Sequence, residues 1–146
     1  YVDIVGDIRD LSQFQDESVE VVYASHVLEH VCQQEMKTTL HGIHRILKKD
    51  GLFYCSVPNM EVLAKLLISE RLNPQQKWHV MRMIFGGQTD KNDFHYFGWT
   101  LDFAKAFFGG AGFRNIKVVK SFNIFDDTSD YKPYGVQISL NLIAKK

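Results

Sequence analysis

Three residues whose side chains bind metals or transfer protons stand close together in this chain, at His26, Glu29 and His30. A helix that begins after Ser25 would bring all three to one face, because residues three and four positions apart are neighbours on a helix. An imidazole titrates near neutral pH, so His26 or His30 is suited to deprotonate an acceptor hydroxyl as a general base. The alternative is structural, with Glu29 and His30 pairing only with loop backbone. The spacing therefore predicts a candidate catalytic site here.

The composition of the chain narrows the partners it can have. Of its 146 residues, 45% are hydrophobic and 23% are charged, which is the usual balance for one globular domain. Seventeen basic and seventeen acidic residues cancel, which argues against nucleic-acid binding through a general positive field. The longest apolar stretch, 62–68, contains Lys65 and is far shorter than the roughly 18 apolar residues of a membrane span. We therefore predict no membrane partner and no nucleic-acid partner.

The first residues and the two cysteines indicate a compartment. Residues 1–7 carry two acids and lack the basic start and longer apolar run of a secretory signal. Cys32 and Cys55 form no CxxC pair, which favours free buried thiols, with a single disulfide as the open alternative. These features predict a cytoplasmic protein.

Apolar patterns in the first half of the chain predict a βαβ unit. Residues 2–6 and 19–24 have the β-branched density of buried strands, and 52–57 is another apolar strand. Between the last two we expect a helix of roughly twenty residues that Gly51 closes as its C-terminal stop. Its apolar face recurs at i, i+4, i+7 and i+11, in the residues Met36, Leu40, Ile43 and Leu47. A strand, helix and strand in this order predict parallel strands with a right-handed crossover.

Helical spacing returns in the middle of the chain. Apolar residues at 62–67 and 78–84 predict two helices, which together form a helical insertion at about 60–87 over the sheet. Thr100 can cap a further helix over 101–108.

Two final strands are predicted at 116–119 and 136–144, as an antiparallel pair. Strands that alternate with helices indicate an α/β protein with an open sheet and a mixed edge, in one domain covering 1–146. Ligands of such sheets bind beyond the carboxyl ends of the strands. That rule selects four places, which are residues 6–8, 24–26, 58–59 and the aromatic loop 94–99. The aromatic loop is suited to cover an acceptor and exclude water, or else packs on the sheet edge by its own rings.

Successive motifs of the chain resemble those of class I S-adenosylmethionine-dependent methyltransferases, in particular the type 11 group. The matching stretches are 6–11 (GDIRDL), 18–31 (SVEVVYASHVLEHV), 45–51 (RILKKDG) and 56–59 (SVPN). Residues 99–100 and 111–113 resemble the closing helix and sixth strand of the same family. The match runs along nearly the whole chain, and the VLEH and RxLKxxG motifs at this spacing are fairly specific.

The resemblance implies a three-layer, Rossmann-like α/β sheet, mostly parallel with an antiparallel C-terminal strand. In that family a first strand, a glycine-rich turn and a second strand ending in an acid precede the segment that corresponds to residues 2–6. The sequence holds none of these three features, so we expect an N-terminally truncated chain. The absent strands would lie between 2–6 and 19–24, and exposed strand edges invite pairing, here in a homodimer.

The cofactor that the resemblance implies is S-adenosylmethionine. Asp7 would accept a hydrogen bond from the adenine amino group and the Ile8 amide would meet the ring, or Asp7 bonds only within its own turn. Ala24, Ser25 and His26 would form the turn beside the methionine end of the cofactor. Ser25 is also expected to be the N-cap of the following helix.

A metal site is a further implication of the resemblance. Small-RNA 2'-O-methyltransferases and ubiquinone O-methyltransferases are similar here, with a Glu-x-x-Glu-His motif and a distal His that hold a divalent metal. The corresponding residues are His26, Glu29, His30 and the distal His95. A histidine in place of the first glutamate weakens the case for Mg²⁺ and leaves Zn²⁺ or no metal. The pattern also matches the HxxEH signature of inverted zinc peptidases, which makes a metal hydrolase a distant alternative.

The function that these features imply is methyl transfer, more in keeping with oxygen than with nitrogen as the acceptor, to a small molecule or a sugar. His26 and His30 are the catalytic candidates, and Asn59, His95 and Tyr96 are the candidate substrate contacts. The alternative is a non-catalytic methyltransferase-like fragment that acts as an interaction module.

Overall fold

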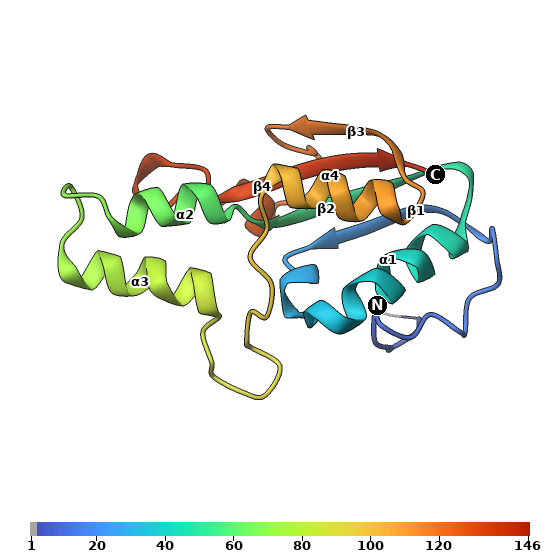
Figure 1. The fold of residues 1–146 in the computed structure, drawn as a ribbon, viewed down its shortest axis with the longest axis horizontal. Coiled ribbons are helices and arrows are strands. Elements are labelled where there is room, and N and C mark those ends of the chain that lie inside the picture. The colour runs from blue at the N-terminus through green and yellow to red at the C-terminus, as the bar shows by residue number, and fades with distance from the viewer. Residues whose placement is uncertain (1–2) are drawn as a thin grey trace.

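A four-stranded sheet organises the computed structural model, which describes residues 3–146. The strand order is β1-β2-β4-β3, formed by β1 (Val19–Ser25), β2 (Leu47–Pro58), β3 (Arg114–Val119) and β4 (Ser139–Lys145). β1 pairs in parallel with β2, whereas β4 is antiparallel to both of its neighbours. Three strands therefore run in one direction and β4 in the other, which confirms the predicted mixed α/β sheet (Figure 1).

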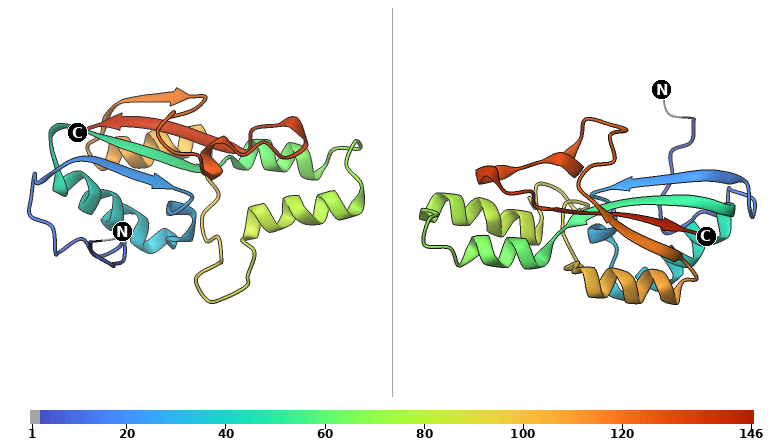
Figure 2. Two further views of the ribbon diagram at one scale, coloured as in Figure 1. Left: turned by 180° about the vertical axis from the view of Figure 1, so that it is seen from behind. Right: turned by 90° about the horizontal axis from the view of Figure 1, so that it is seen from above.

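Two helices cover one face of this sheet, α1 (Gln33–Ile46) and α4 (Leu101–Gly110), as Figure 2 shows. The predicted apolar stripe of α1 is its buried face, with Met36, Leu40 and Ile43 inaccessible to solvent. Thr100 caps α4 as predicted, because its side chain accepts a hydrogen bond from the Phe103 amide. The opposite face carries the loop between β3 and β4, which contains the short 3-10 helices η2 (Thr128–Asp130) and η3 (Pro133–Gly135).

The helices α2 (Met60–Leu67) and α3 (Pro74–Phe85) lie side by side and project beyond the sheet (Figure 1). They share a small apolar cluster of their own, in which Leu63, Val80 and Ile138 are buried. Among the described residues, no helix combines the length and apolar character needed to cross a lipid bilayer.

The predicted first strand does not form over its described part. Val2 lies outside the described residues, and residues 3–6 adopt no strand, with Val5 93% exposed. A strand is held by ladder bonds to a neighbour, and within residues 3–146 no strand lies beyond β1 to receive this segment.

The predicted end of the first long helix was also wrong. α1 stops at Ile46, Leu47 is already extended, and Gly51 lies inside β2 rather than at a helix terminus. A side chain at Gly51 would come within about 3 Å of the backbone oxygens of Lys48 and Glu20, so this glycine permits a close approach of β2 to β1. Gly51, which was interpreted as a helix stop, is therefore required for the close pairing of β2 with β1. The last strand is shorter than predicted as well, because it begins at Ser139 and not at 136.

Candidate active site

The end of β1 places His26 at a sharp turn. The His26 amide donates to the Ser56 carbonyl at 2.8 Å, which extends the β1–β2 pairing by one residue, and His26 then takes a left-handed φ of +52°. A helix cannot begin where the amide is held by the sheet and the backbone turns left-handed. The predicted helix with Ser25 as its N-cap is therefore wrong. A single turn of 3-10 helix, η1 (Leu28–His30), follows, and α1 begins only after Cys32.

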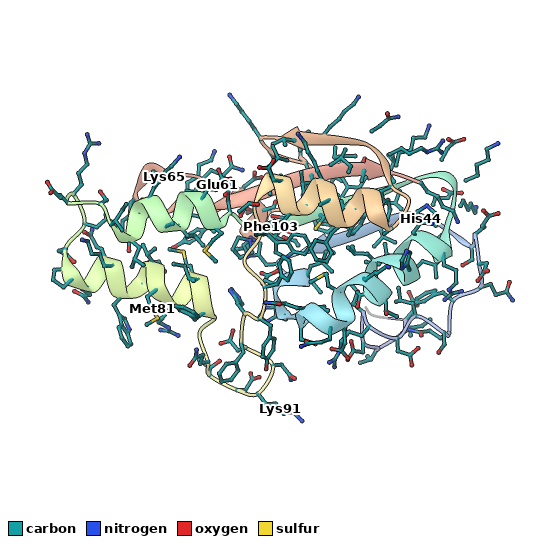
Figure 3. All side chains as sticks on the ribbon, viewed as in Figure 1. His44, Glu61, Lys65, Met81, Lys91 and Phe103 are labelled. Carbon is teal, nitrogen blue, oxygen red and sulfur yellow. The ribbon has the colours of Figure 1, made fainter. Side chains whose placement is uncertain are left out.

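A cavity of about 550 Å³ opens beside this turn. It is lined by residues 6–9 on one side, by His26, Val27, His30 and Val31 on another, and by Lys91, Asn92 and Tyr96 from the loop between α3 and α4. Figure 3 shows Lys91 at the tip of that loop. The cavity thus brings together five predicted site residues, namely Asp7, Ile8, His26, His30 and Tyr96.

Asp7 is held by a neighbour that the sequence analysis did not single out. The Arg9 Nε donates to Asp7 Oδ1 at 2.9 Å and to Oδ2 at 3.0 Å, and the Arg9 amide also donates to Oδ1. These bonds to Arg9 lower the pKa of Asp7 to about 2. A basic residue two positions after a turn aspartate was the available signal. Asp7 is consequently an anion with a fixed orientation at the cavity wall.

The His26 ring is clamped on both sides. Its Nε2 lies 2.9 Å from Ser139 Oγ, at the start of β4, and its Nδ1 lies 3.3 Å from Glu29 Oε1. The Ser139 hydroxyl also donates to the Thr128 carbonyl at 3.0 Å. Ser139 comes from a strand over a hundred residues away, and local sequence carries no signal for that contact.

Glu29 is the most deeply buried acid of the site. Its side chain is 1% exposed, and neither carboxylate oxygen has a hydrogen-bond partner among the described residues. Its backbone carbonyl accepts from the amides of Tyr96 at 2.7 Å and Phe97 at 3.3 Å. Glu29 therefore anchors the loop that closes one side of the cavity.

His30 and His95 approach each other across the same place. Their ring centroids are 4.7 Å apart, nearly perpendicular. The Nδ1 atom of His30 lies 3.0 Å from the Phe94 carbonyl, and that of His95 lies 3.0 Å from the Met83 carbonyl. Burial lowers the pKa of His95, which the Glu29 carboxylate partly opposes.

A cluster suited to a metal ion results from these positions. One ligand atom each from Glu29, His30 and His95 lies within 4.8 Å of the others, whereas His26 is outside this group. Three of the four predicted ligands are thus brought together. An orphaned buried carboxylate beside two imidazoles fits a divalent cation of the kind that nitrogen and oxygen ligands share.

The remaining predicted site residues lie outside the lining of this cavity. Asn59 uses its side-chain oxygen as the N-cap of α2, accepting from the Glu61 and Val62 amides. Ala24 is buried in the core, and Ser25 ends β1 with a buried hydroxyl that has no partner among residues 3–146.

The two ends of the aromatic loop 94–99 differ in role: one packs in the core and the other lies at the cavity. Trp99 is 1% exposed and packs with Phe97 and Phe107, so this end of the loop belongs to the core. Phe94 and Tyr96 stack on each other and are exposed, with Tyr96 at the cavity.

The chain is similar to known methyltransferases in part of its sequence and in its fold. Residues 2–55 match the family model described as a methyltransferase domain. A search of the curated proteins found no match.

Solved structures of methyltransferases are similar in fold to this chain over nearly its whole length. A SAM-dependent methyltransferase from Archaeoglobus fulgidus has a TM-score of 0.60 at 17% identity, over 98% of this chain and 66% of its own. A SAM-dependent methyltransferase from Thermotoga maritima has a TM-score of 0.60 at 17% identity, over 97% and 62%. The 1,6-didemethyltoxoflavin-N1-methyltransferase of Burkholderia thailandensis, with its substrate and S-adenosylhomocysteine bound, has a TM-score of 0.56 at 16% identity, over 95% and 48%. This chain therefore spans less than two thirds of the length of each.

At identities this low, the structural likeness shows the fold alone. The family model adds a sequence match over residues 2–55. Both agree with the motifs quoted above. The match over residues 2–55 to a methyltransferase-domain model and the fold shared with SAM-dependent methyltransferases both support the resemblance to class I methyltransferases.

Proposed function

We propose that this chain takes part in S-adenosylmethionine-dependent methyl transfer to oxygen of a small molecule or a sugar. The observation that carries the proposal is the single cavity that joins residues 6–8 to His26 and His30. The first group is the candidate contact for the adenine end of the cofactor, and the second group holds the catalytic candidates. A volume of about 550 Å³ suits a small ligand rather than a polymer.

Asp7 would bind the adenine amino group in exchange for part of its contact with Arg9. A carboxylate offers about four lone-pair positions, and the amide, Nε and Nη2 of Arg9 already make four contacts to its two oxygens, so the adenine amino group would replace one of them. The ion pair also keeps the carboxylate charged and fixes its direction. Orientation of this kind reduces the cost of binding, because the group is ordered before the ligand arrives.

His26 is the residue we assign to accept the proton of an acceptor hydroxyl. Glu29 Oε1, 3.3 Å from Nδ1, stabilises the imidazolium that forms when Nε2 takes up a proton. Because the Ser139 hydroxyl donates to the Thr128 carbonyl, Nε2–H is the donor in its contact with Ser139. Nε2 can therefore take up the proton only after this contact opens and the ring hydrogen has moved to Nδ1, beside Glu29 Oε1. His30 lines the same cavity and is the candidate contact to the acceptor oxygen, with Tyr96 beside it.

S-adenosylmethionine would supply the methyl group as an electrophilic sulfonium. The chain's own contribution is to align acceptor and methyl group and to remove one proton. The exposed ring of Tyr96 at the cavity would limit the access of water to the acceptor.

Calorimetric titration of S-adenosylhomocysteine into the 146-residue chain tests the cofactor part of this proposal. We expect one site of micromolar affinity, and about tenfold weaker binding in Asp7→Ala, which is about 1.4 kcal/mol. The matched control is Asp50→Ala, an exposed aspartate that pairs with Lys145 away from the cavity and should leave affinity unchanged. No binding at millimolar ligand, or equal binding by both variants, would refute the assignment.

Transfer of a labelled methyl group to a panel of hydroxyl and amine compounds then tests the acceptor class. We expect label only in hydroxylated small molecules or sugars, with the rate reduced on the order of 100-fold in His26→Asn. Labelled amines alone would contradict the oxygen assignment.

A further inference from the structure

We propose that the outward face of α3 docks on an anionic lipid bilayer, which the chain contacts at its surface without crossing it. The face is formed by Trp78, Met81, Arg82 and Phe85. The groove along it shares no lining residue with the cavity beside His26, so the proposal does not rest on methyl transfer.

The two sides of α3 have different surroundings. On one side Val80 is buried and Ile84 packs beside it, in the apolar cluster that α3 shares with α2. Residues 78, 81 and 85 follow one another at intervals of three and four, so they form a stripe on another side of the helix. Figure 3 shows Met81 on the side of α3 that faces away from α2. The helix therefore has a second apolar face.

This second face is open to solvent. Trp78 is 63% exposed and Phe85 is 52% exposed. A groove of about 310 Å³ lies along the face, lined by its four residues and by 86–88. Because α2 and α3 project beyond the sheet, the face lies at the periphery of the molecule (Figure 1). Large apolar side chains that gather on one exposed face indicate a contact surface.

The charges on α3 determine which partner fits this surface. The helix carries Lys77 and Arg82 and no acidic residue. Neither cation forms an ion pair within residues 3–146. Arg82 Nη2 donates to the Gly87 carbonyl at 3.3 Å, which uses one of its five N–H donors. The chain as a whole is neutral, so this excess of positive charge is local to α3.

Exposed aromatic rings beside unpaired cations are typical of a helix that lies in a membrane interface. The charged ends of lysine and arginine reach lipid phosphates while their stems stay on apolar surface. An indole ring places its apolar body toward the acyl chains and its N–H toward water. A second copy of the chain fits less well, because pairing two such faces would bring Lys77 and Arg82 toward their own like charges. An acidic protein helix is the competing partner, and the experiment separates it.

Binding at the bilayer surface needs no membrane-spanning helix. The prediction of no membrane partner was based on the lack of a long apolar stretch. Interfacial binding requires only an amphipathic face and a local excess of cations. The 12 residues of α3 supply both.

Vesicle binding tests the proposal directly, with no need for activity. The native chain is mixed with phosphatidylcholine vesicles, with and without one third phosphatidylglycerol, and followed by co-sedimentation and tryptophan fluorescence. The chain has two tryptophans, and Trp99 is only 1% exposed, so a blue shift reports on Trp78. We expect binding and a blue shift with the anionic vesicles alone, both weakened by salt because salt screens the charges.

Two variants and two matched controls locate the surface. We expect Arg82→Glu and Phe85→Ser each to weaken binding to anionic vesicles at least about tenfold. Lys117→Glu makes the same charge change on β3, and Phe125→Ser removes a ring of similar exposure, 59%, from the loop between β3 and β4. Both controls should bind as the native chain does. All four positions are exposed, and circular dichroism verifies that the variants fold.

Each of four results would overturn the proposal. The first is no binding of the folded native chain to anionic vesicles, and the second is equal binding to both kinds of vesicle. The third is undiminished binding by Arg82→Glu and Phe85→Ser. The fourth is a blue shift of Trp78 with an acidic amphipathic peptide but not with vesicles, which would assign the face to a protein partner instead.

Discussion

His44 is a residue whose charge state is tied to the packing of the fold. It lies on α1 (Figure 3), and its ring centroid is 5.2 Å from that of Phe113 in an edge-to-face arrangement. Gly112, at φ +99°, lets the chain pass over the ring, since a side chain there would approach His44 Nε2 to 3.0 Å. Burial, and then the charge of Lys146, lower the pKa of His44, with smaller effects of His41 and Arg114 in the same direction.

This shift predicts how stability depends on pH. The folded state binds the His44 proton less well than the unfolded chain, so the stabilising effect is complete above the usual pKa of about 6.5 and is lost as pH falls below it. We expect His44→Gln to lose less free energy of unfolding than the native chain between pH 7.5 and 5.5. Urea unfolding across that range measures the difference. Curves that stay parallel would show that His44 is not responsible.

Site residues could be predicted from the sequence where their position in a turn or at a strand end marks them locally. Asp7, His26 and His30 were selected from turn and strand-end positions, and the fold does place them at one cavity. Arg9 and Ser139, which fix two of these side chains, were not predicted. Arg9 lies only two residues after Asp7, a local signal that was overlooked, whereas Ser139 comes from a distant strand and carries no local signal.

The helix α3 depends on a cap at its first residue. Asn73 accepts from the Gln76 amide at 2.9 Å, and the Gln76 side chain accepts from the Asn73 amide at 2.9 Å, a reciprocal capping box. Each bond satisfies a backbone donor that the helix itself leaves open.

Loss of this cap should destabilise the chain measurably. We expect Asn73→Ala to lower the free energy of unfolding by about 1 kcal/mol and Tm by about 2–4 °C. Gln75→Ala, an exposed change two residues further along, should remain within about 0.5 kcal/mol of the native chain. Thermal unfolding of both variants compares them, and equal losses would show that the cap contributes nothing specific.

Elements with a strong local signal were predicted well, and their boundaries less so. Thr100 marked a helix start that the structure has, whereas α3 begins at Pro74, four residues before the predicted start at 78. The start of α1 was missed because the tertiary bond from His26 to Ser56 competes with helix formation, and periodicity does not register such a bond.

At the scale of the whole molecule, β1 and β3 are the outer strands of the described sheet. Val21 on β1 is 48% exposed, beside an apolar groove of about 320 Å³ that also contacts Ile4, Leu11 and Phe14. The homodimer through strand edges remains a prediction, and the β1 edge is where we expect it. Unpaired apolar edges favour pairing with another chain.

Sedimentation of the chain at 5 and 200 µM checks this expectation. We expect a monomer–dimer equilibrium that Val21→Lys shifts to monomer by at least tenfold, because a lysine on an edge strand opposes pairing. Val118→Lys, a comparably exposed valine on β3, is the control and should leave the equilibrium unchanged. A native chain that is monomeric at both concentrations would contradict the prediction.

The architecture was predictable as a whole because βαβ alternation and family motifs both point to it, whereas the segment 2–6 was not. Its apolar pattern is that of a strand, yet a pattern specifies a strand only where a neighbour offers a ladder. Sequence periodicity reports which side chains favour burial, and it carries no information on which partners are present.

The backbone carbonyl and the side-chain carboxylate of Glu29 contact different parts of the site, which links the two thermodynamically. The carbonyl holds Tyr96 and Phe97, while the carboxylate faces His30 and His95. Any ligand that draws the carboxylate toward itself also acts on the loop through the same residue, and reciprocity requires that ordering the loop strengthens that ligand by an equal factor. Binding of a ligand to the Glu29 carboxylate and ordering of the loop that carries Tyr96 and Phe97 are therefore coupled, and each favours the other to the same extent.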